Sequence, residues 1–135
     1  MINIIGGPKG TGKTKMIIDS ANASVATASG NVVFVTDTNR YMYELNRNVK
    51  VINVKDYKIA GEEALCGFIR GIIAGNRDIE NIYIDGCARI AGKDLSEMAA
   101  FFYMLDKVSE DCNMKITLTC SSELSELPPF VAKYL

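Results

Sequence analysis

The residues best suited to chemistry form a glycine-rich segment near the N-terminus. Residues 7–14 read GPKGTGKT and fit the pattern G-x-x-x-x-G-K-[ST], between a short apolar run and a segment with helical periodicity. Glycines accept backbone angles that are closed to other residues, so successive N–H groups from about Gly10 to Thr14 can point inward around a phosphate. The N-terminus of the following helix adds partial positive charge at the same point. This spacing predicts a phosphate-binding loop, and an ordinary glycine-rich turn is the alternative.

Two side chains of this segment have defined roles in such a loop. Lys13 is expected to reach the β- and γ-phosphates of a nucleotide as a point charge, and the Thr14 hydroxyl is expected to ligate Mg²⁺. Lys9 and Lys15 flank the loop, where they either contact phosphate or a neighbouring subunit, or remain solvated. The expected nucleotide-binding residues are Gly7, Pro8, Lys9, Gly10, Thr11, Gly12, Lys13, Thr14 and Lys15.

The elements that must position this loop follow from the spacing of apolar residues. That spacing predicts strands at residues 2–5, 32–35, 49–54, 82–85 and 115–119, separated by segments of helical periodicity that include 13–28 and 61–74. Strands that alternate with helices are typical of right-handed βαβ units. The sequence therefore predicts a single α/β domain over residues 1–135, a three-layer α/β/α sandwich with a mainly parallel five-stranded sheet. Ligands on such sheets bind at the carboxyl ends of the strands.

Three local signals predict where the remaining helices begin and end. Residues 37–39 (Asp-Thr-Asn) are expected to cap a short helix that runs to residue 45. Asp94 and Glu97 have the spacing of a capping box, opening a helix with Cys112 at the end of its inner face. The pair at 128–129 (Pro-Pro) is expected to stop a helix that begins near Ser121.

Composition excludes several classes of function. With 15 Lys and Arg against 16 Asp and Glu the net charge is −1, which gives no strong sign of nucleic-acid binding. The absence of histidine removes Ser-His-Asp sites and HExxH zinc sites. The four cysteines form no CxxC pair, so small buried thiols in a reducing compartment are favoured over a metal site. No segment is suited to a signal peptide or a bilayer span, so we expect a cytoplasmic protein without membrane insertion.

Together, the loop at 7–14 and the acid that ends a later apolar strand resemble the P-loop NTPase superfamily over nearly the whole chain. Asp85, after Ile-Tyr-Ile at 82–84, resembles the Walker B aspartate, which holds Mg²⁺ directly or through water; an ordinary strand-terminal acid is the alternative. Two predicted strands lie between the loop and Asp85, which resembles the RecA-like arrangement. In that family an acid beyond the second strand polarises the attacking water, and Asp37 holds this place, although it could equally cap a helix. Residues 119–121 lie where related ATPases sense the γ-phosphate.

The details of these motifs separate the chain from several branches of the superfamily. The loop differs from the GPPGTGKT of AAA+ ATPases only at Lys9, but Gly86 follows Asp85 where those proteins have a catalytic glutamate. The guanine-specificity motif N/TKxD is absent, so ATP is favoured over GTP. The resemblance favours the strand order 3-2-4-5-1 over 3-2-4-1-5.

The resemblance implies a slow Mg²⁺-dependent ATPase that acts with a protein partner or as an oligomer. Lys13 and Asp37 would be its catalytic residues, and Thr14 and Asp85 would hold the Mg²⁺ that accompanies ATP. Slow turnover is expected because no glutamate follows Asp85 and no arginine could be assigned to the terminal phosphate. The first alternative is a nucleotide-gated interaction module that does not hydrolyse ATP. A small-molecule phosphotransferase is the weaker alternative, because such kinases usually close a lid over the acceptor.

Overall fold

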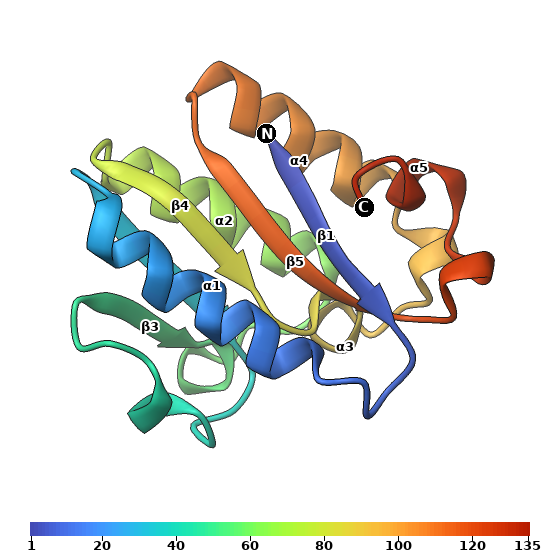
Figure 1. Cartoon of the computed structure of the whole chain (residues 1–135). Helices are drawn as coiled ribbons and strands as arrows, with labels where there is room; N and C mark the ends of the chain where they lie inside the picture. The colour runs from blue at the N-terminus through green and yellow to red at the C-terminus, as the bar shows by residue number, and fades with distance from the viewer.

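Five parallel strands form the centre of the fold, shown in Figure 1 by a computed structural model that describes residues 1–135. The strands lie in the order β1-β5-β4-β2-β3, so β1 and β3 are the edges. Read from β3, this is the predicted order 3-2-4-5-1. The strands are β1 (Ile2–Gly7), β2 (Asn31–Thr36), β3 (Val49–Asn53), β4 (Ile79–Ile84) and β5 (Lys115–Ser121).

Helices cover both faces of this sheet, which confirms the predicted three-layer α/β/α sandwich. The helix α1 (Lys13–Thr27) covers one face, and α2 (Glu62–Gly75) and α4 (Ala99–Asp111) cover the other (Figure 1). Two shorter helices, α3 (Cys87–Ala91) and α5 (Pro129–Ala132), lie at the carboxyl edge of the sheet and at the C-terminus. Single turns of 3₁₀ helix complete the chain: η1 (Met42–Glu44), η2 (Val54–Tyr57), η3 (Leu95–Glu97) and η4 (Leu124–Glu126).

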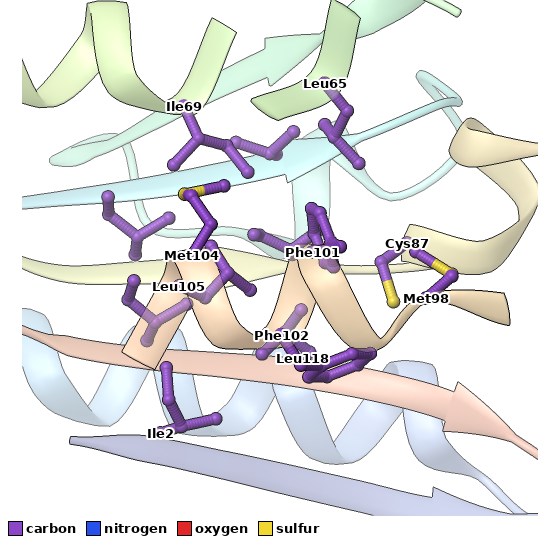
Figure 2. Close-up of a cluster of buried hydrophobic side chains, with 14 of the residues drawn as sticks. Ile2, Leu65, Ile69, Cys87, Met98, Phe101, Phe102, Met104, Leu105 and Leu118 are labelled. Atoms are coloured by element: carbon purple, nitrogen blue, oxygen red, sulfur yellow. The ribbon is translucent and has the colours of Figure 1, made fainter. Parts of the chain in front are cut away.

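The larger part of the hydrophobic core fills the space between the sheet, α2 and α4. Figure 2 shows Phe101 and Met104 of α4 directed toward Leu65 and Ile69 of α2. On the other side of α4, Phe102 lies near Leu118 of β5. These side chains are buried, and each contributes roughly 1.5–3 kcal/mol through removal of its apolar surface from water. This packing fixes β4 and β5 side by side, and both strands end at the candidate site.

A smaller core joins α1 to the opposite face of the sheet. Ile17, Ile18 and Ala21 of α1 pack against Phe34 of β2 and Tyr83 of β4. Because both faces of the central strands are covered, residues 32–35 are all buried, which explains why they read as a continuous apolar run. The packing of α1 on these strands sets the direction in which the N-terminus of that helix points.

Two of the predicted helix starts are wrong. After β2 the chain forms only the 3₁₀ turn η1 rather than a helix over 38–45, and Asp37 caps nothing there. Before α4, the Asp94 side chain makes no capping hydrogen bond, and the Glu97 N–H is bonded to the backbone carbonyl of Asp94 instead. The helix then ends at Asp111, so Cys112 is exposed rather than on an inner face.

The predicted helix near Ser121 is also wrong, because β5 continues to that residue. An antiparallel bridge between Ser122 and Gly7 then ties the chain to the start of the glycine-rich loop. The proline pair begins α5 instead of stopping a helix: Pro129 occupies its first position, where a missing N–H costs no hydrogen bond.

Candidate phosphate-binding site

The glycine-rich segment forms a loop that joins the end of β1 to the start of α1. Gly10 and Gly12 have φ values of 81° and 83°, in the left-handed region that favours glycine. Gly12 is the N-cap of α1, and no side chain caps this helix terminus. The N–H groups of the first turn of a 15-residue helix therefore face the loop, as a phosphate site requires.

Lys13 bridges the base of the loop from the first position of α1. Its Nζ donates to the carbonyl oxygen of Pro8 at 2.8 Å, and the Thr11 hydroxyl donates to the same oxygen at 2.7 Å. Lys13 is buried, and this burial lowers the pKa of its ammonium, while the nearby Asp85 carboxylate acts in the opposite direction. The loop conformation thus holds the Lys13 ammonium at the base of the loop, against the carbonyl oxygen of Pro8.

Asp85 lies directly after β4, with its carboxylate shared between two hydroxyl groups. The Thr119 hydroxyl donates to Oδ1 at 2.7 Å and accepts the N–H of Gly86 at 3.0 Å. The Thr14 hydroxyl faces Oδ2 at 3.4 Å, which is wider than the usual 2.5–3.0 Å of a hydroxyl–oxygen hydrogen bond. Asp85 is only 2% exposed, so Thr119 fixes a carboxylate that would otherwise be buried with few partners.

The arrangement of Thr14 and Asp85 suits a Mg²⁺ ion that arrives with a nucleotide. Protein sites for Mg²⁺ commonly supply one or two oxygen ligands and leave the remaining positions to water and phosphate. The structure holds no group of three or more carboxylates or thiols that could bind a metal by protein ligands alone. The oxygens of Thr14 and Asp85 therefore fit the predicted ion, as partners of a phosphate group.

The role of residues 119–121 in sensing a terminal phosphate stays a prediction, and the structure gives the Thr119 hydroxyl contacts of its own. Its hydroxyl is engaged by Asp85 and by the backbone of Gly86, so it orients the expected metal ligand. Thr119 can contact Asp85 because β4 and β5 are neighbours in the sheet. The two residues are 34 positions apart in the sequence, so no local sequence pattern predicts this contact.

Asp37 lies in the turn after β2, and its carboxylate is paired with an arginine. Both of its oxygens accept hydrogen bonds from Arg89, at 3.0 Å from Nε and 3.1 Å from Nη2. These bonds lower the pKa of Asp37 and raise the pKa of Arg89. The Asp37 carboxylate, which was predicted to orient water, therefore forms a bidentate ion pair with Arg89.

Sequence reasoning did not assign Arg89 to this site. It lies on α3, a five-residue helix whose three buried positions make too short a stretch for helical periodicity to reveal. The available signal was its position four residues beyond Asp85, one helical turn from the end of an apolar strand.

A cavity of about 400 Å³ adjoins the loop at the carboxyl edge of β4 and β5. Five of its ten lining residues are charged, three of them positive and two negative. The lining residues are Lys9, Gly86, Ala88, Arg89, Gly92, Lys93, Asp94, Glu97, Thr119 and Ser121. The cavity therefore presents side chains of both signs.

The two lysines that flank the loop lie in different surroundings. Lys9 lines the cavity, whereas the Lys15 ammonium lies 3.4 Å from Asp19 on an exposed face of α1. Contacts of Lys9 and of Lys15 with a nucleotide both stay predictions.

Comparison with known proteins identifies no family for the chain. The chain matches no protein-family model, and no curated protein is significantly similar to it. None of its helices combines the length and the apolar character needed to cross a bilayer. Any indication of function therefore lies in the chemistry of the site.

Proposed function

We propose that the chain binds ATP together with Mg²⁺ and hydrolyses it slowly. The observation that carries the proposal is the convergence of the glycine-rich loop, the buried Lys13 ammonium and the facing oxygens of Thr14 and Asp85. These groups come from β1, α1 and β4, and together they supply amide donors, a cation and metal ligands.

Each group has one task in this proposal. The amides from Gly10 to Thr14 bind the phosphate oxygens, and Lys13 places its charge against the outer phosphates. The oxygens of Thr14 and Asp85 hold the metal, which supplies charge neutralisation on the phosphates. Thr119 keeps the Asp85 carboxylate in a single orientation through the 2.7 Å hydrogen bond. The site thus positions the substrate before it does any chemistry.

Slow turnover is expected because the site has no free carboxylate to accept a proton from the attacking water. No glutamate follows Asp85, and Asp37 has both oxygens bonded to Arg89 with a lowered pKa. A carboxylate in this state is a weak proton acceptor at neutral pH. A protein partner or a second copy of the chain would complete the site, so we expect turnover per chain to rise with protein concentration. The four free cysteines fit a cytoplasmic setting.

The test is thermal unfolding of the chain with Mg²⁺ and ATP, GTP or ADP, compared with Lys13→Ala. A ligand at about 100 times its Kd adds roughly 2.7 kcal/mol of stability, so ATP should raise the midpoint of the wild type by several degrees. Lys13→Ala should lose this increase, because the loop then lacks its cation. Lys107→Ala, which removes an exposed ammonium from α4, is the matched control and should keep the increase. An unchanged midpoint with every nucleotide would reject the proposal.

The engaged state of Asp37 favours one second candidate, a nucleotide-gated interaction module without hydrolysis. This candidate predicts the same stabilisation by ATP but no release of phosphate, even at high protein concentration. A phosphate-release assay over a range of protein concentrations separates the two: release above the Lys13→Ala background supports the slow ATPase, and its absence supports the module.

A further inference from the structure

The net charge of −1 is the sum of two parts with opposite sign. Residues 40–58 hold five Lys and Arg against two Asp and Glu, a net charge of +3, whereas the rest of the chain holds ten against fourteen, a net charge of −4. The same short segment contains three of the six tyrosines. Binding of a polyanion depends on such local clusters of charge, which the net charge of the whole chain does not show.

The basic segment forms one edge of the sheet. It runs from the turn after β2 through η1, β3 and η2, and Figure 1 shows it on the side of the sheet opposite β1. At the β1 edge the C-terminal segment lies against the strand, and the carbonyl oxygen of Tyr134 accepts the Ile4 N–H at 2.9 Å. At the other edge β3 has a neighbour on one side only, which is β2. We refer to residues 40–58 as the β3 edge surface.

The cations of the β3 edge surface are all exposed, and none of them forms an ion pair. The structure has three ion pairs, and all of them join residues outside this surface. The two acids of the surface, Glu44 and Asp56, are exposed and equally unpaired. A lysine on an edge strand commonly prevents pairing with another strand, but this accounts for Lys50 alone. The cations are Arg40, Arg47, Lys50, Lys55 and Lys58.

Two tyrosine rings of the β3 edge surface extend into solvent. Tyr43 of η1 is 95% exposed, and Tyr57 at the end of η2 is 67% exposed. One lies before β3 and the other after it, so both ends of the edge strand carry an aromatic ring. Aromatic side chains normally stabilise a fold through the large apolar surface that they bury. Rings with this exposure contribute little to the core and are free to stack on a ligand.

Cations together with exposed aromatic rings are the groups that bind single-stranded nucleic acid. Lysine and arginine neutralise the phosphates, and the rings stack on unpaired bases. An acidic protein segment would use the cations but offers no planar bases to the rings. A nucleic-acid duplex keeps its bases stacked on one another, so it also leaves the rings without a partner. The composition of this surface therefore favours a single strand over both.

We propose that the β3 edge surface binds single-stranded nucleic acid, with its cations against the phosphates and with Tyr43 and Tyr57 stacked on bases. Stacking and charge contacts depend little on the identity of the base, so we expect little preference for sequence. This binding goes beyond the proposed function and does not depend on it, because the surface lies outside the glycine-rich loop.

The experiment measures binding of the full chain to a fluorescent oligothymidylate of about 15 nucleotides by anisotropy, at salt concentrations between about 50 and 200 mM. Each phosphate that is neutralised on a single strand contributes roughly 0.7 to the slope of log affinity against log salt, so five cations give a slope of up to about −3.5. Lys50→Gln combined with Lys55→Gln should make this slope shallower by about 1.4. Lys107→Gln, which removes an exposed ammonium from α4, is the matched control and should not change the slope.

The tyrosine variants test stacking without a change in charge. Tyr43→Ala and Tyr57→Ala should each weaken binding roughly 5- to 150-fold, which is the loss expected for one stacked base. Tyr43→Phe should keep the affinity, because the ring remains. Tyr103→Ala is the matched control, since this tyrosine is 69% exposed on α4. Thermal unfolding of the same samples checks that each variant is folded.

Several outcomes would overturn the inference. It fails if the wild type binds no oligonucleotide at about 50 mM salt, or if both alanine variants of the tyrosines bind like Tyr103→Ala. Equal affinity for a duplex of the same length also refutes it, because no stacking on unpaired bases is then involved. Displacement by polyglutamate as readily as by unlabelled strand would indicate a surface for acidic proteins. Displacement by Mg²⁺ with ATP would place the strand at the glycine-rich loop instead. Stabilisation of the chain by ATP is measured separately, so either proposal can fail while the other stands.

Discussion

Thr119→Val is the most direct test of the geometry around Asp85. The substitution keeps the shape of the side chain and removes the hydroxyl that donates to Asp85 at 2.7 Å and accepts the Gly86 N–H at 3.0 Å. Thr119 is only 4% exposed, so water cannot easily replace the lost contacts. A hydrogen bond to a charged group contributes about 1.5–3 kcal/mol, and an unpaired buried amide adds to that cost.

We therefore expect Thr119→Val to lower the free energy of unfolding by roughly 2–4 kcal/mol. For a chain of this size that is a fall in melting temperature on the order of 6–15 °C. Urea denaturation followed by circular dichroism measures the first quantity directly. The same variant should need more Mg²⁺ to support ATP binding, since the carboxylate loses the group that orients it.

The matched control for this measurement is Thr117→Val, which removes a hydroxyl from the same strand at the same 4% exposure without touching Asp85. If both variants lose the same small amount of stability, under about 0.5 kcal/mol, the buried hydrogen bond is refuted as a stabilising contact. An unchanged Mg²⁺ dependence in Thr119→Val would refute the orienting role of the hydroxyl.

Two other perturbations test separate parts of the site. The pKa of Asp37 is lowered in the folded chain by its hydrogen bonds to Arg89, so the pair contributes stability that is present above the ordinary aspartate pKa and is lost as the pH falls through the folded value. Urea unfolding between pH 7 and pH 3 should therefore show a steeper loss for the wild type than for Asp37→Asn, and equal slopes would contradict the pairing. Gly12→Ala forces a Cβ onto a residue with φ of 83°, at a cost of about 1–2 kcal/mol, while the space around it is open. It should weaken ATP binding more than it lowers stability, which titration and thermal unfolding of the same sample can compare.

The strands and the long helices could be predicted because their signals lie within single segments. Residues 32–35 are apolar without a break because helices cover both faces of the sheet, and that burial makes the run visible in the sequence. The face of α2 with Leu65, Ile69 and Ile73 repeats at helical spacing for the same reason. The loop at 7–14 was recognisable because phosphate binding by amides needs glycines and a lysine at fixed separations.

The helix ends were less predictable, since the same residue types serve several local structures. Asp94 has the spacing of a capping box with Glu97, but the backbone there forms a 3₁₀ turn that satisfies the Glu97 N–H without the side chain. The proline pair was expected to stop a helix, but Pro129 is equally compatible with a first helical position, and this is where it lies. Tertiary packing, rather than composition, selected between these structures.

The contacts that give the site its character join segments that no local pattern links. Thr119 and Asp85 meet because β4 pairs with β5, and Asp37 meets Arg89 because β2 pairs with β4 and α3 turns back over Gly86. The sequence predicted that the Asp37 carboxylate, after β2, would be available to water. In the fold it is bonded to Arg89, which lowers its pKa. The type and place of a residue thus predicted which groups gather at the carboxyl edge, and the pairing between them determines the state of each: both oxygens of Asp37 are bonded to Arg89, so this carboxylate is part of an ion pair.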